Sequence, residues 1–155
     1  MPTTALSTQF KTDMLNGKVN IAGGSPLTYK MLLIKVGASG TYNNTLTNVG
    51  TPGSGTPTTS NVGTDEASGA GYATGGATLA GGTVTLYSTT GTATFTSPVT
   101  WSTATISAIC AVVYESVSKD VVGVFDFGGT ISSTAGTFTV TLPTPGAATS
   151  LVQVS

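Results

Sequence analysis

The sequence contains no histidine and no arginine, and all five of its cations are lysines. Without histidine, no side chain has an unperturbed pKa near neutrality for general base catalysis. Without arginine, there is no bidentate fork for a phosphate or a carboxylate. Charged residues make up only 7% of the chain and the net charge is −1, so the basic surface that nucleic-acid binding requires is also lacking. The composition predicts a protein that is not an enzyme, holds no cofactor or metal, and does not bind nucleic acid.

Cysteine and long apolar runs are also scarce. Cys110 is the only cysteine, and it lies in the apolar run 106–114, so we expect a small buried side chain rather than a nucleophile. Residues 1–17 lack the basic start and the apolar region of a secretion signal. No apolar run approaches the ~20 residues needed to cross a bilayer. We therefore expect a soluble protein that is made in the cytoplasm and has no membrane partner.

Threonine and glycine dominate what is present, and threonine suits a pleated sheet surface. Most of the chain after Gly17 reads as short strands separated by Thr-Gly and Ser-Pro turns. The expected strands are 27–36, 83–87, 92–96, 99–101, 104–115, 121–127, 137–142 and 150–155. The segment 104–115 is expected to be the central strand. In 137–142, Phe138, Val140 and Leu142 are expected to point inward. The pattern predicts an all-β sandwich or a jelly-roll-like domain.

Residues 3–17 form the only good helix candidate. Its apolar stripe has a spacing of four residues and consists of Leu6, Phe10 and Met14. Thr3 or Thr4 is expected to cap the start, and Gly17 to close the end. A helix this short is marginal alone, so residues 1–17 are predicted to dock either on the single β domain of residues 18–155 or on a neighbouring subunit.

A long Gly/Thr-rich segment, 37–82, interrupts the strand pattern. A structureless insertion of this length is usually functional or bound to a partner. We expect it to be an extended arm that is mobile in the free protein, with glycines that permit close backbone approach. Its apolar anchors would be Tyr42, Leu46, Val49, Val62, Tyr72 and Leu79. Asp65 and Glu66, the only adjacent acids, are interpreted as a solvated turn at the polar rim of this arm, and a calcium site is the alternative.

Two further residues allow two interpretations each. Trp101 stands at a strand junction, where a core position is favoured over a sugar-binding platform. Asp126 lies between two phenylalanines in a strand, and a structural role with hydroxyl or amide partners is favoured over catalysis.

Four stretches, in this order, resemble a known family: TQFKTDMLNG (8–17), GTDEASGAGYATGGATL (63–79), VTWSTATISA (99–108) and VFDFGGTISSTAGTFTVTLP (124–143). The family comprises small virion structural proteins of tailed bacteriophages, and the resemblance spans residues 8–143. The chain departs from it in the central strand, where an arginine associated with the family is absent.

The resemblance implies a head decoration or cement protein that binds the major capsid protein or other virion proteins. It further implies a homo-oligomer, with a trimer favoured. The protein would be located in the virion, which is assembled in the host cytoplasm. A neck or tail component, or an adhesion protein that binds carbohydrate, is the alternative. The resemblance supplies no enzymatic residues. The predicted partner-binding residues come from the helix stripe and the arm: Leu6, Phe10, Met14, Tyr42, Leu46, Asp65, Glu66, Tyr72 and Leu79.

Overall fold

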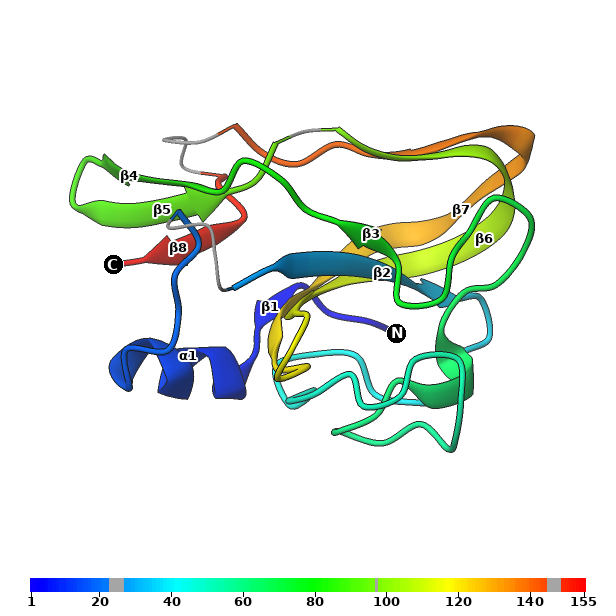
Figure 1. The fold of residues 1–155 in the computed structure, drawn as a ribbon, viewed down its shortest axis with the longest axis horizontal. Helices are drawn as coiled ribbons and strands as arrows, with labels where there is room; N and C mark the ends of the chain where they lie inside the picture. Colours follow the sequence, from blue (N-terminus) through cyan, green and yellow to red (C-terminus); the bar gives the residue numbers. More distant parts are fainter. Residues whose placement is uncertain (23–26, 97, 145–148) are drawn as a thin grey trace.

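The structure is a computed structural model that describes residues 1–22, 27–96, 98–144 and 149–155 (Figure 1). It is built mainly of antiparallel strands, with one short α-helix and one 3-10 turn. In chain order the elements are β1 (Ala5–Leu6), α1 (Thr8–Leu15), β2 (Tyr29–Lys35), η1 (Gly63–Asp65), β3 (Ala77–Thr78), β4 (Thr83–Tyr87), β5 (Thr90–Thr94), β6 (Val99–Glu115), β7 (Val121–Val140) and β8 (Val152–Val154).

The strands form two antiparallel sheets. The larger sheet has the order β1-β7-β6-β2-β3, and the smaller one has the order β4-β5-β8. This confirms the predicted all-β, sandwich-like class, and β6 is the central strand of the larger sheet, as 104–115 was expected to be. The segments 99–101 and 104–115 are parts of one strand, because β6 continues through register shifts between Trp101 and Ile106.

The larger sheet has an apolar core on each face. Along β2, Met31 and Leu33 face a first core that also contains residues of β5 and β8. Leu32 and Ile34 face a second core on the opposite side. The alternation follows from the period of two in a strand. A strand that is apolar on both faces must be covered on both faces.

The helix packs on the chain's own β domain, which was one of the two predicted sites. Phe10 is buried in the first core, and Met14 packs against that core as a partly buried side chain. Leu6 also packs there, but it lies in β1, because the helix begins at Thr8 and not at Thr3 as expected. The N-cap is Ser7, not Thr3 or Thr4, and its Oγ accepts a hydrogen bond of 3.1 Å from the Gln9 amide. The chain leaves the helix at Gly17, which has a φ of +68° as its expected role requires.

The segment 37–82 is the cover of the second core, which corrects the expectation of a mobile arm. Tyr42, Leu46, Val49 and Val62 are buried there against the larger sheet. Backbone hydrogen bonds tie the segment together and to its surroundings: the Val62 amide donates to the Val49 carbonyl, and the Val49 amide to the Lys119 carbonyl, each at 3.0 Å. The apolar residues that were expected to anchor it on a partner anchor it on this chain's own sheet.

β6 and β7 form a long ribbon that bends and runs back over the larger sheet toward the smaller one (Figure 1). Register shifts interrupt their pairing at several places. Near the end of β7, Phe138 is buried, Val140 is half-buried and Leu142 beyond the strand is buried, while the threonines between them are exposed. The predicted inward alternation of 137–142 is therefore confirmed.

Candidate functional site

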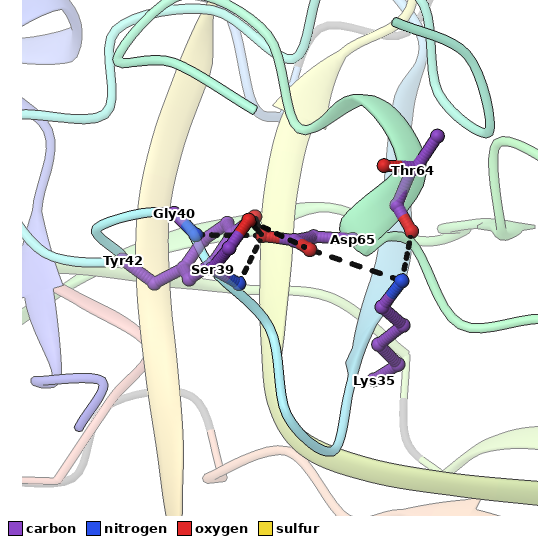
Figure 2. A network of polar contacts seen from close by, with 6 residues as sticks. All are labelled: Lys35, Ser39, Gly40, Tyr42, Thr64 and Asp65. Carbon is purple, nitrogen blue, oxygen red and sulfur yellow. Dashed lines mark hydrogen bonds and ion pairs between the residues drawn. The ribbon is translucent and has the colours of Figure 1, made fainter. Parts of the chain in front are cut away.

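Asp65 lies at the centre of a polar network in the 37–82 segment (Figure 2). Its Oδ2 accepts hydrogen bonds from the Ser39 amide at 2.8 Å, the Gly40 amide at 2.7 Å and the Tyr42 hydroxyl at 2.8 Å. The Lys35 Nζ lies 3.9 Å from Oδ1. The carboxylate is buried and is fully supplied with donors, as a buried charge must be.

This network joins three separate parts of the chain. Lys35 ends β2, Gly40 and Tyr42 belong to the loop that follows it, and Asp65 is the last residue of η1. The Lys35 ammonium also donates to the Thr64 carbonyl. Burial beside the Asp65 carboxylate raises the pKa of Tyr42, so its hydroxyl stays protonated and continues to donate. The arrangement locks the loop in place, and the expected solvated turn at this position is corrected.

Glu66, the next residue, is held by different partners. Its Oε1 accepts from the Tyr72 hydroxyl at 2.9 Å and from the Gly75 amide at 2.6 Å. The side chain is only 3% exposed, and Oε2 has no hydrogen-bond partner among the described residues. Burial raises the pKa of the Glu66 carboxyl, and the two hydrogen bonds and the charge of Lys30 oppose that rise. Burial of the Glu66 carboxylate is therefore energetically unfavourable.

The glycines of this segment approach the chain's own strands. Gly76 has a φ of +70°, and a Cβ there would collide with the Met31 carbonyl oxygen of β2. Gly71 has a φ of +75°, and a Cβ there would lie 2.7 Å from the Ser102 carbonyl oxygen of β6. These contacts require glycine. Close backbone approach was correctly expected, but its target is the larger sheet of the same chain.

The predicted partner-binding residues thus fall into distinct places. Asp65 and Tyr42 are in direct contact, as are Glu66 and Tyr72. Leu46 lies in the second core, and Leu79 lies with Phe10 in the first. The structure brings these residues together as interior packing and not as one surface. Phe10, Tyr42, Leu46 and Leu79 are buried within the chain, whereas Leu6, Met14 and Tyr72 are half-buried.

A cavity of about 450 Å³ lies between α1 and the β6–β7 turn. Asp13, Glu115 and Asp120 line it, together with Lys18. Each acid has a partner: Asp13 accepts from the Gln9 side chain at 3.0 Å, Glu115 accepts from the Ser118 amide at 2.6 Å, and Asp120 accepts from Asn48 at 2.9 Å. Within the described residues, no group of three or more potential metal ligands is present.

The aromatic candidates are interior residues. Trp101 is buried and stacks on Tyr72 with ring centroids 6.0 Å apart, and Phe138 meets it edge-on at 6.0 Å. The core interpretation of Trp101 is confirmed, and Tyr42 is buried as well. A sugar-binding platform needs an exposed aromatic face, which neither residue offers. Cys110 is also buried, and burial raises its pKa to about 12, as expected for an unreactive thiol.

The surface feature that the sequence did not reveal is β4. All five of its residues are exposed, and Val84, Leu86 and Tyr87 are large apolar side chains. The alternation in Thr83–Tyr87 correctly predicts a strand, but it does not show whether the apolar residues of that strand are buried or exposed. An edge strand without charge is unusual, but the sequence does not show that this strand lies at an edge.

Comparison with protein-family models, with curated proteins and with solved structures found no match to this chain. The fold and the site therefore rest on the chain's own geometry. Among the described residues, no helix has the length and apolar character needed to span a membrane.

Proposed function

We propose that this chain is a non-enzymatic structural protein of a tailed-bacteriophage virion, and that it acts as a decoration or cement protein on the major capsid protein. The observation that carries the proposal is the β6–β7 ribbon. Along residues 127–140 no strand pairs with the outer edge of β7 within the described part of the chain, since β1 pairs only with Gly123 and Val124. The sequence resemblance over residues 8–143 supports the same role.

The chemistry of the ribbon suits a neutral protein partner. Residues 127–140 contain no charged side chain, and serine and threonine hydroxyls, such as those of Ser107 and Ser132 at 2.7 Å from each other, cover its surface. Ile131 is exposed at the rim of a shallow groove of about 250 Å³ that Phe127, Phe138 and Val140 also line. An apolar side chain of a capsid subunit fits this groove, and repetition over a symmetric shell makes weak single contacts sufficient.

The test is incorporation into particles of the phage that encodes the chain. Deleting the gene and supplying the protein in trans should restore density on the outer face of the capsid by cryo-electron microscopy. Ile131→Asp should reduce the amount that co-sediments with particles by about tenfold or more, whereas Val117→Asp, at an exposed position in the β6–β7 turn, should not. Density at the neck or tail would favour the alternative location, and particles without the protein would overturn the proposal.

A further inference from the structure

The core-facing side of the smaller sheet continues past the core. Val84 pairs with Ala93 and Leu86 with Gly91 across β4 and β5. Ala93 is buried in the first core, and side chains of directly opposed residues share one face. Val84 and Leu86 therefore lie on the core-facing side, yet they are 56% and 70% exposed.

The part of this face that lies beyond the core is uncovered. Two rows of residues cross the three strands through the pairing of β4 with β5 and of β5 with β8: Val84–Ala93–Val152 and Leu86–Gly91–Val154. The first row ends in the core, and in the second row Val154 is 49% exposed. A groove of about 450 Å³ lies under this face, with Phe10 and Met14 of α1 on its other side. The described residues that line it carry no charge.

The other sheet edges are less suited than β4 to continuous strand pairing with an identical edge. β1 and β3 have two residues each, and β8 has three. The long β7 pairs with β6 through register shifts and contains the positive-φ residues Gly128 and Ala135. β4 pairs with β5 through five residues without a shift, and it contains no lysine or proline. Short length, bulges, lysine and proline are the devices that keep edges apart.

We propose that β4 is the pairing edge for a second copy of this chain. The two β4 strands run antiparallel about a two-fold axis at Thr85, and they join the two smaller sheets into one. Thr85 then lies opposite Thr85 of the second copy, and Val84 lies opposite Leu86 of the second copy. This register places the four aliphatic side chains side by side on the uncovered face.

The absence of charge on this edge fits a second copy of the chain as the occupant. β4, β5, β8 and the described lining of the groove are all neutral, so pairing with an identical edge buries no unpaired charge. A basic or acidic partner would bury its own charges against this surface without compensation. An edge that pairs with itself is an isologous interface, which closes at two copies. The pair therefore differs from the trimer implied by the sequence resemblance.

The first test is the mass of the purified chain in solution by sedimentation. We expect the wild-type protein to be a dimer. For Leu86→Lys, we expect the dissociation constant of the dimer to be about tenfold higher or more, so that the variant is monomeric. Val117→Lys, which adds the same charge at an exposed apolar position far from β4 in sequence, should remain a dimer. A monomeric wild-type protein at about 100 μM, a trimer, or a Leu86→Lys dimer of undiminished affinity would overturn the proposal.

The second test reads the register directly. Opposed residues of an antiparallel pair have Cα atoms about 4.5–5.5 Å apart, which lies within disulfide range. Thr85→Cys should form an intermolecular disulfide under mild oxidation. Thr83→Cys should not, because the two copies of residue 83 would lie roughly 13 Å apart along the strand. The native Cys110 is buried and does not interfere. Equal cross-linking at both positions would contradict this register, and with it the proposed pairing. Neither test requires the virion, so each can fail independently of the proposed function.

Discussion

The hydroxyl of Tyr72 donates a 2.9 Å hydrogen bond to the buried carboxylate of Glu66. The same hydroxyl accepts a 3.0 Å hydrogen bond from the Leu33 amide in β2. One side chain thus connects the acid of the long loop to the middle of the larger sheet. The cost of this connection is a buried carboxyl oxygen without a partner in the described structure, and stability should therefore depend on pH at this point.

Glu66→Gln should be more stable than the wild-type protein at neutral pH. The folded protein has the higher Glu66 pKa, so it binds more protons than the unfolded chain does between the ordinary glutamate pKa of 4.5 and the folded value. The stabilising contribution is present below pH 4.5 and is lost as the pH rises through the folded pKa. Urea midpoints from pH 4 to pH 8 would measure this. Equal pH slopes for the variant and the wild type would contradict it.

Glu115→Gln should show the opposite trend. Burial alone would raise the pKa of Glu115, but hydrogen bonds from the Ser118 and Val117 amides outweigh it and lower the pKa. The Glu115 contribution is therefore present above the unfolded pKa of 4.5 and is lost as the pH falls through the lower folded value. The variant should lose stability at pH 7 and approach the wild type in acid, as measured by the same urea series. A loss that persists unchanged at low pH would show that the charge is not its cause.

Tyr42→Phe should destabilise the fold by about 1.5–3 kcal/mol, because it removes a buried hydrogen bond to a charged group. The Tyr42 hydroxyl is one of three close donors to Asp65 Oδ2. Urea unfolding would measure the change in free energy. Ser39→Ala is the matched control, because the Ser39 hydroxyl lies at 3.4 Å or more from both Asp65 oxygens and should cost much less. Equal losses would mean that the network does not depend on the hydroxyl of Tyr42.

Phe10→Ala should cost about 3–5 kcal/mol, as expected for an aromatic side chain removed from a core. Phe10 is 2% exposed, whereas Leu15, the last residue of the same helix, is 91% exposed. Leu15→Ala should therefore stay within about 0.5 kcal/mol of the wild type. Thermal unfolding followed in the β signal of circular dichroism would separate the two. Loss of the helix without a change in the β transition would show that α1 is an independent segment.

The Val49 and Val62 amides in the 37–82 segment should be protected from hydrogen exchange in the isolated protein. The Val62 and Val49 amides donate to backbone carbonyls at 3.0 Å, and Val49 and Val62 are both fully buried. Such amides open only with larger units of structure. The Thr45 amide, which is hydrogen-bonded only to the neighbouring Asn43 side chain at the surface, is the internal comparison. If the Val49 and Val62 amides exchanged as fast as the Thr45 amide, the segment 37–82 would be a mobile arm after all.

Cys110 should not react with thiol reagents in the folded protein. The thiolate is the reactive species, and burial raises the pKa of Cys110 to about 12. Colorimetric thiol titration should therefore find no reactive group in buffer at pH 8 and one per chain in denaturant. Rapid labelling of the native protein would show that the second core is open to solvent.

The sequence predicts the strands well where a run of apolar or alternating residues is long enough. β2, β6 and the end of β7 all follow from such patterns. The loop 37–82 was misjudged because its apolar residues have no regular period, and composition alone does not show what they pack against. The sequence of β2 does indicate that a second cover is needed, because Leu32 and Ile34 on one face must be buried as much as Met31 and Leu33 on the other. The expected helix and strands cover only one of these two faces.

The site residues were harder to place for a different reason. Adjacent acids in a Gly-rich segment usually lie in solvent, and Asp65 and Glu66 are buried only because the donors of Gly40, Tyr42 and Tyr72 converge on them. That convergence depends on tertiary contacts between residues far apart in the chain. β4 was recognised as a strand, but its exposure depends on how far the smaller sheet extends beyond the core, which strand patterns do not encode.

The double-sided strand β2 has a consequence for how the molecule can come apart. Its alternate side chains belong to the first core and to the second core. A shift of β2 by one residue would therefore move each side chain to the opposite face of the sheet and disrupt the packing of both cores. We therefore expect the first core, which α1 covers, and the second core, which the 37–82 segment covers, to unfold together. A proteolytic cut that releases the cover of one core should leave no stable fragment. Substitutions in one core are likewise limited by the packing of the other, because both cores share β2.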